Sequence, residues 1–119
     1  MDSPGNINVV RGYGAGAIRV GEQSYTRVCV VAAQTLLSDW PPESLDEIQE
    51  QHLPTLLALQ PEIVLIGSAG AQSFAPRNLR RWFAAKNIAL EPMELGAACR
   101  TYNVLAQEGR PVVAVLFPA

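Results

Sequence analysis

The sequence predicts an α/β domain with a parallel or mixed central sheet, and three observations support this class. After residue 62, apolar runs alternate with stretches of helical character, the pattern of parallel strands joined by helices. The runs at 63–66 and 112–117 are apolar at nearly every position, as expected for strands covered on both faces. The first third is instead rich in β-branched residues and glycine turns. Together these features predict a three-layer, Rossmann-like domain that begins with an antiparallel β meander.

The chain length bounds the domain organisation. A chain of 119 residues can bury one adequate hydrophobic core and seldom two. We therefore expect a single domain over residues 1–119. Its predicted parts are the β meander (1–35), a proline-rich loop with short helices (36–61) and a βαβαβ unit (62–118).

Turn and helix signals precede the βαβαβ unit. The stretch "RGYGAG" suits a tight turn or bulge between two short strands, and "SYTRVCVVAA" favours a further strand of the meander. Ser44, followed three residues later by Glu47, resembles a capping box that opens a short helix. Pro54 is unfavourable inside a helix, so we expect this helix to end near His52 and a new turn to begin at Pro54.

Within the βαβαβ unit, the most apolar strands are expected to be central neighbours. This gives the strand order 88-63-112, with the helices at 77–86 and 95–106 on opposite faces and the weaker 88–91 strand toward an edge. The order creates a switch point beyond the carboxyl end of strand 63–66. Open α/β sheets tend to bind ligands in such a crevice, and both helix N-termini would point toward it.

Composition excludes several function classes. The formal net charge is −2 and no face-wide stripe of Lys and Arg is visible, so we expect no binding to nucleic acid. The longest apolar run is far shorter than the roughly 20 residues that span a bilayer, so no membrane insertion is expected. Cys29 and Cys99 lie in apolar or small-residue contexts that suit buried free thiols, and no targeting sequence is recognised at the N-terminus. We expect a reduced, cytoplasmic protein.

Two local charge runs of opposite sign stand out. Residues 39–62 carry six acidic side chains and no Lys or Arg, whereas residues 77–86 carry only basic ones. We interpret them as solvated helix faces that attract each other, with a partner surface as the alternative. Leu79, Trp82 and Phe83 form the apolar stripe of the basic helix. Because Trp and Arg are enriched in interface hot spots, the candidate interaction surface comprises Arg77, Arg80, Arg81 and Trp82.

A candidate ligand site follows strand 63–66. Glycines after a strand permit close backbone approach to a phosphate, although the spacing here matches neither G-x-G-x-x-G nor a Walker motif. A loop of purely structural importance is therefore the first interpretation. The alternative is a ligand site that combines this loop with polar residues of the 95–106 helix: Gly67, Ser68, Gly70, Arg100, Thr101 and Asn103.

The residues that could perform catalysis form no recognisable set. His52 is the single histidine, so there is no metal-ligand pattern and no base placed beside a nucleophile. On the 95–106 helix, Cys99 and Tyr102 face the buried side, whereas Arg100 and Asn103 face outward. Cys99 is accordingly interpreted as structural, with a reactive redox thiol as the alternative. We expect no catalytic residues, no metal and no cofactor.

A family resemblance adds to this interpretation. The stretch "AACRTYNVL..EGR" at 97–110, together with Gly67, Gly70 and Met93, resembles an uncharacterised-domain family with many bacterial and archaeal members. That family includes the mitochondrial respiratory complex I assembly factor 3 and a cytosolic vertebrate protein associated with adipogenesis. The resemblance implies one three-layer α/β domain with extra N-terminal strands, a bacterial member, and no established enzyme activity.

The resemblance and the missing catalytic set favour the same function. We expect a non-enzymatic protein-interaction domain, similar to an assembly factor, that is a monomer or a weak homodimer with unknown protein partners. The alternative is a small-molecule or anion-binding protein, enzymes included, that uses the crevice at Gly67–Gly70 and the 95–106 helix.

Overall fold

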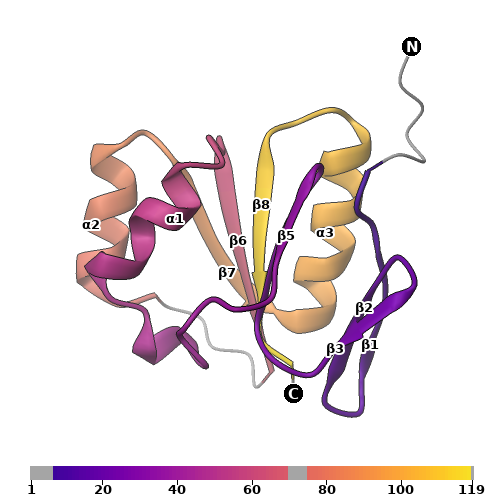
Figure 1. Cartoon of the computed structure of the whole chain (residues 1–119). Coiled ribbons are helices and arrows are strands. Elements are labelled where there is room, and N and C mark those ends of the chain that lie inside the picture. Colours follow the sequence, from indigo (N-terminus) through magenta and orange to yellow (C-terminus); the bar gives the residue numbers. More distant parts are fainter. Residues whose placement is uncertain (1–6, 70–74, 119) are drawn as a thin grey trace.

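A mixed five-stranded sheet forms the centre of the molecule in the computed structural model, which describes residues 7–69 and 75–118 (Figure 1). Its strand order is β5 (Thr35–Leu37), β4 (Cys29–Ala32), β8 (Val112–Leu116), β6 (Ile63–Ser68) and β7 (Ala89–Glu94). β6 is parallel to β7 and β8, while β4 is antiparallel to both β8 and β5. The predicted order of the last three strands is confirmed.

Helices cover both faces of this sheet. α1 (Leu53–Leu57) and α2 (Arg77–Ala85) pack on one face, and α3 (Leu95–Gln107) packs on the other (Figure 1). Because side chains alternate along a strand, β6 contributes to both cores: Val64 and Ile66 join the α1/α2 core, and Leu65 joins the α3 core. The three-layer arrangement is therefore as predicted.

The meander is shorter than predicted. Strands β1 (Val10–Gly14), β2 (Ala17–Val20) and β3 (Gln23–Tyr25) form a separate antiparallel sheet beside α3. The chain then leaves this sheet, and β4 enters the central sheet, so the prediction of a meander to residue 35 is wrong for its last part. The physical reason is that "VCVV" is apolar at every position. Val30 packs into the α1/α2 core and Val31 into the α3 core, which requires a strand covered on both faces.

The segment before β6 is also built differently from the prediction. It forms the 3-10 helices η2 (Leu45–Glu47) and η3 (Glu50–His52), and α1 follows directly with Pro54 in its first turn. Ser44 makes no side-chain cap, and the Glu47 carboxylate accepts from the Glu43 N–H at 3.1 Å. The Gln49 N–H donates to Nδ1 of His52 at 2.9 Å. η3 ends at His52 as predicted, but α1 begins at Leu53 rather than at Pro54, and the capping residues are Gln49 and His52.

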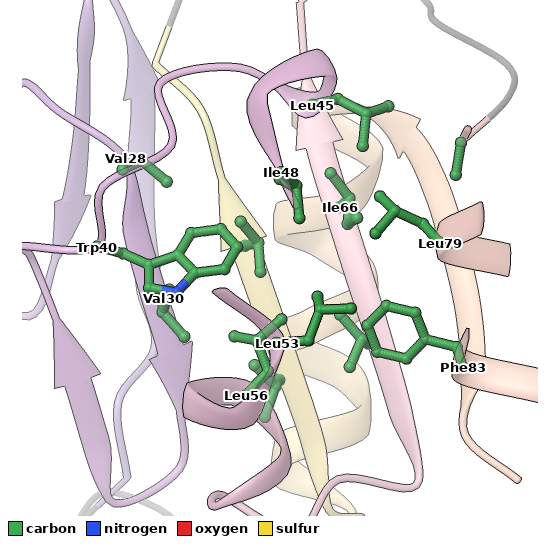
Figure 2. Packing of buried hydrophobic residues seen from close by; sticks show 14 of the residues in the cluster. Val28, Val30, Trp40, Leu45, Ile48, Leu53, Leu56, Ile66, Leu79 and Phe83 are labelled. Atoms are coloured by element: carbon green, nitrogen blue, oxygen red, sulfur yellow. The ribbon is translucent and has the colours of Figure 1, made fainter. Parts of the chain in front are cut away.

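Trp40 completes the core beneath α1 and α2. Figure 2 shows its ring in the same buried layer as Leu53 and Phe83. Its indole N–H donates to the His52 carbonyl oxygen at 3.3 Å, and the two rings meet edge to face. Trp40 is thus buried with its polar group satisfied, and it fixes the loop that carries η2 and η3 onto the sheet.

Strand β7 forms one edge of the sheet, as predicted. The Ala89 N–H donates to the Glu62 carbonyl at 3.0 Å, so the N–H positions at residues 90 and 92 face away from β6. Residue 92 is a proline, which removes a donor only from the open edge. Pro92 therefore preserves the ladder while it hinders the pairing of a further strand.

Candidate functional site

The signature helix α3 packs on β6 at Gly67. A methyl group at Gly67 would lie 2.6 Å from Cβ of Ala98 and 3.1 Å from Cδ2 of Leu116. Only a glycine opposite an alanine allows this close approach of helix and strand. Gly67 thus has a packing role that explains its place at the end of β6, and Gly70 lies outside the described residues.

Tyr102 and Asn103 fasten the N-terminal segment to α3. The Asn103 side chain accepts from the Val10 N–H and donates to the Val10 carbonyl, both at 2.9 Å. The fully buried Tyr102 hydroxyl donates to the Asn8 carbonyl at 2.8 Å, and burial raises the pKa of Tyr102 above its usual value. The prediction that Asn103 faces outward is therefore wrong. Its side-chain amide binds the backbone of β1 at Val10, where a neighbouring strand would otherwise pair.

Asn8 extends this network to the central sheet. Its side-chain nitrogen donates to the carbonyl oxygens of Ala32 at 2.9 Å and Thr35 at 3.2 Å. The Asn8 N–H donates to the carbonyl of Ala33 at 2.9 Å. One asparagine thereby joins the β4–β5 turn to α3 through Tyr102. The sequence pattern gave no signal for Asn8, because its partners lie far along the chain.

Arg100 meets the meander instead of an acidic side chain. It is exposed, and its Nη1 donates to the Tyr13 hydroxyl at 3.5 Å. Among the described residues, no carboxylate oxygen lies within 4.0 Å of Arg100. Tyr13 also covers Gly96, where a Cβ would collide with the hydroxyl. Tyr13 thus contacts both Arg100 and Gly96, a role that the sequence pattern did not indicate.

The N-terminus of α3 already holds an anion. The Glu94 side chain accepts from the Ala97 N–H at 3.2 Å and so caps the helix. An anionic ligand at this helix end would have to displace that carboxylate. Glu94 therefore weakens the case for a phosphate site at α3.

A cavity of about 260 Å³ lies at the predicted crevice, beyond the carboxyl ends of β6 and β8. It is lined by Glu43, Ser44, Leu45, Asp46, Ser68, Ala69, Phe117 and Pro118. Arg100, Thr101 and Asn103 are not among the lining residues, because they belong to α3 on the opposite face of the sheet. The structure thus separates Ser68 from Arg100, Thr101 and Asn103, and the two carboxylates at the cavity disfavour an anion.

Both thiols are buried in the core under α3. Burial raises the pKa of Cys99 to about 11, and the nearby Glu94 carboxylate adds to this effect while Arg100 opposes it. Burial also raises the pKa of Cys29 to about 12, with a smaller contribution from Cys99. A thiol that stays protonated is a poor nucleophile, which agrees with the structural interpretation of Cys99.

These thiols predict a loss of stability at alkaline pH. In the unfolded chain they titrate near 9.0, whereas the folded Cys99 titrates at about 11. The unfolded state therefore releases protons first, and the free energy of unfolding should fall as the pH rises from 9 toward 11. Urea unfolding below and above pH 9 measures this, with Cys29→Ala/Cys99→Ala as the comparison. An equal decline in the double variant would assign the effect to other groups.

The predicted interaction residues lie on α2. Arg77, Arg80 and Arg81 are all exposed, and the Arg80 Nε also donates to the Ala75 carbonyl at 3.2 Å. The half-buried Trp82 ring packs edge to face on Phe83, and the Lys86 ammonium lies 4.9 Å from its centroid. We call the set Arg77, Arg81, Trp82 and Lys86 the α2 surface.

The expected attraction between the two charge runs is not realised as ion pairs. The acidic run pairs elsewhere: Glu43 lies 3.8 Å from Arg27, and Glu62 lies 3.7 Å from Arg110. Within the described ranges, no carboxylate oxygen approaches a cation of the α2 surface to within 4.0 Å. Glu43 and Glu62 instead lie beside the β3–β4 and α3–β8 connections, which carry Arg27 and Arg110. The α2 cations are left facing solvent.

In residues 7–69 and 75–118, no three His, Cys, Asp or Glu side chains gather as they would around a metal ion. Over the same residues, every helix is too short or too polar to cross a bilayer.

The fold and contacts define a class: a mixed α/β domain in which a glycine–alanine contact packs α3 on the central sheet, and Tyr102 and Asn103 bind the N-terminal segment to the same helix. The chain belongs to the family described as "Protein of unknown function (DUF498/DUF598)", which matches residues 10–117. The resemblance stated from the sequence is thereby confirmed.

Known relatives agree with this assignment. The chain is 29% identical over 99 residues to the "13 kDa major membrane protein" of Francisella tularensis, covering 83% of this chain and 80% of that protein. It is 30% identical over 92 residues to mouse "NADH dehydrogenase [ubiquinone] 1 alpha subcomplex assembly factor 3", covering 76% of this chain but 49% of the mouse protein. A crystal structure from Bordetella parapertussis is 32% identical, with a TM-score of 0.85 over 95% of this chain and 97% of that one.

Proposed function

We propose that this chain is a non-enzymatic protein-interaction domain that acts in the cytoplasm and resembles an assembly factor. The observation that carries the proposal is the α2 surface, where the exposed Arg77 and Arg81 share a helix with a half-buried Trp82 over which Lys86 lies. Such a combination suits an acidic protein surface, because arginine pairs with carboxylates and tryptophan supplies contact area.

The state of the reactive side chains supports this proposal. The Asn103 amide and the Tyr102 hydroxyl hold backbone groups of the N-terminal segment. The His52 imidazole caps η3, and both thiols are buried and protonated. Each of these groups is therefore hydrogen-bonded within the fold or buried in its core, which disfavours a role in acid–base or nucleophilic chemistry.

The mouse relative provides a second line of support. It is named an assembly factor, and a protein of that kind works through contacts with other proteins. The matched region is about half of the mouse protein, so we carry over only the general mode of action. The proposed role here is recognition of an acidic surface on a partner during assembly of a complex.

Affinity capture with matched charge reversals tests the proposal. The tagged chain is used as bait in lysate of its native cell, beside Arg77→Glu/Arg81→Glu and the control Arg11→Glu/Arg19→Glu. All four arginines are exposed, and both double variants change the net charge equally. We expect a reproducible partner that the wild type and the control retain and the α2 variant loses. Equal capture by all three, or no partner above background, would contradict the proposal.

Ligand binding at the crevice is the alternative, and Ser68 in the cavity of about 260 Å³ is the observation that favours it. A thermal-shift screen addresses it, because a ligand at 100 times its dissociation constant adds about 2.7 kcal/mol of stability. The screen should include small amines as well as phosphates and nucleotides, since two carboxylates line the cavity. A shift that Ser68→Ala reduces would favour this alternative over the protein-interaction role.

A further inference from the structure

The two charge runs lie on the same side of the molecule. α2 buries Leu79 and Phe83, and the segment with η2, η3 and α1 buries Leu45 and Leu53, in one core over one face of the sheet (Figure 2). Their exposed sides therefore both face away from that sheet. Figure 1 shows α1 beside α2 in this layer.

The exposed carboxylates of this layer form the counterpart of the α2 surface. Asp46, Glu47 and Glu50 are exposed on η2 and η3, and we call them the η surface. Within residues 7–69 and 75–118, none of them lies within 4.0 Å of a Lys or Arg nitrogen. The layer therefore presents one cationic and one anionic patch that do not neutralise each other within the same chain.

A face with adjacent patches of opposite sign is complementary to itself. A two-fold axis between the patches places the cationic patch of one copy on the anionic patch of the other, and the reciprocal contact forms by symmetry. We infer that the acidic partner of the α2 surface is the η surface of a second copy of this chain, which gives a two-fold homodimer. This inference rests on the proposed function, because it names the partner of the same surface.

The physical character of the contact predicts a weak and salt-sensitive dimer. The charged groups are solvent-exposed, so their attraction is modest and is screened as ionic strength rises. Trp82, half-buried on α2, and Leu57, 38% exposed on α1, add apolar area in the same two helices. We expect dimer at high protein concentration and low salt, and monomer at high salt.

A charge-swap experiment tests the inference by sedimentation velocity. One variant carries Arg77→Glu/Arg81→Glu, so both of its patches are acidic, and the other carries Asp46→Lys/Glu50→Lys, so both are basic. Each variant alone should be monomeric at low salt, because like charges then face each other in both contacts. Their equimolar mixture should form a heterodimer, because opposite charges face each other again. Arg11→Glu/Arg19→Glu, on the meander, should dimerise like the wild type.

The outcomes separate this inference from the proposed function. Recovery of the dimer in the mixture also shows that both variants are folded, and circular dichroism checks each one. A wild type that stays monomeric at low salt, a mixture that does not associate, or a dimer insensitive to both reversals would overturn the inference. Loss of a different captured protein in Arg77→Glu/Arg81→Glu, with a monomeric wild type, would overturn it and leave the proposed function standing. A dimer without any other captured protein would leave the inference standing and contradict the proposed function.

Discussion

Replacing Gly67 by alanine should destabilise the protein by about 1–3 kcal/mol, the usual cost of overpacking a close-packed core. The added methyl group would lie 2.6 Å from Cβ of Ala98, and it would also approach the α3 backbone at Leu95. Both neighbours belong to α3, so α3 must move away from β6 to relieve the clash. Urea unfolding followed by circular dichroism measures the loss.

Gly12→Ala is the matched control for this prediction. Gly12 also lies in a strand, and a Cβ there would meet nothing within 4 Å. Its backbone is not in the positive-φ region that favours glycine. We expect a change within about 0.5 kcal/mol of the wild type, as for most exposed substitutions. Equal stability of Gly67→Ala and Gly12→Ala would contradict the close crossing of α3 and β6.

Asn103→Ala should cost at least about 2 kcal/mol, because it removes two hydrogen bonds and leaves the backbone N–H and carbonyl of a buried residue, Val10, without these partners. The effect should be local as well as global, since Asn103 holds β1 on α3. Hydrogen exchange should show faster exchange for the amides of β1 and β2 than for those of β6 and β8. Urea unfolding gives the overall loss.

Asn78→Ala provides the comparison for Asn103→Ala. Asn78 is an exposed asparagine on a helix of the same protein, so its removal changes composition in the same way without removing a contact to the N-terminal segment. We expect it to leave stability nearly unchanged, because alanine has the higher helix propensity. Unaltered exchange of β1 in Asn103→Ala would show that other contacts are sufficient to hold this strand.

The order of the last three strands and the facing of their helices could be predicted, because these features depend on local pattern. The apolar runs of β6 and β8 indicate strands covered on both faces, and the spacing of Leu79 and Phe83 indicates which side of α2 is buried. The same reasoning failed at β4. Its composition suits either a meander or a central sheet, and the choice depends on pairing with β8, more than 80 residues away along the chain.

The candidate site was predicted less well for a related reason. Helical periodicity correctly placed Cys99 and Tyr102 inside. It could not reveal that Asn103 binds Val10 or that Arg100 reaches Tyr13, since these partners are 93 and 87 positions apart. An asparagine on a helix gives the same sequence signal whether its amide meets water or a strand backbone.

We could predict the α/β class, the family and the buried faces of the main helices from residue order, because each depends on a short window of sequence or on a shared signature. Which polar groups are free to act became visible only in the folded chain. The side chains of Asn103, Tyr102 and His52 form hydrogen bonds with backbone groups, whereas the α2 cations face solvent. The physical reason is that a polar side chain takes its role from its hydrogen-bond partner, and distant segments become partners only when the chain folds.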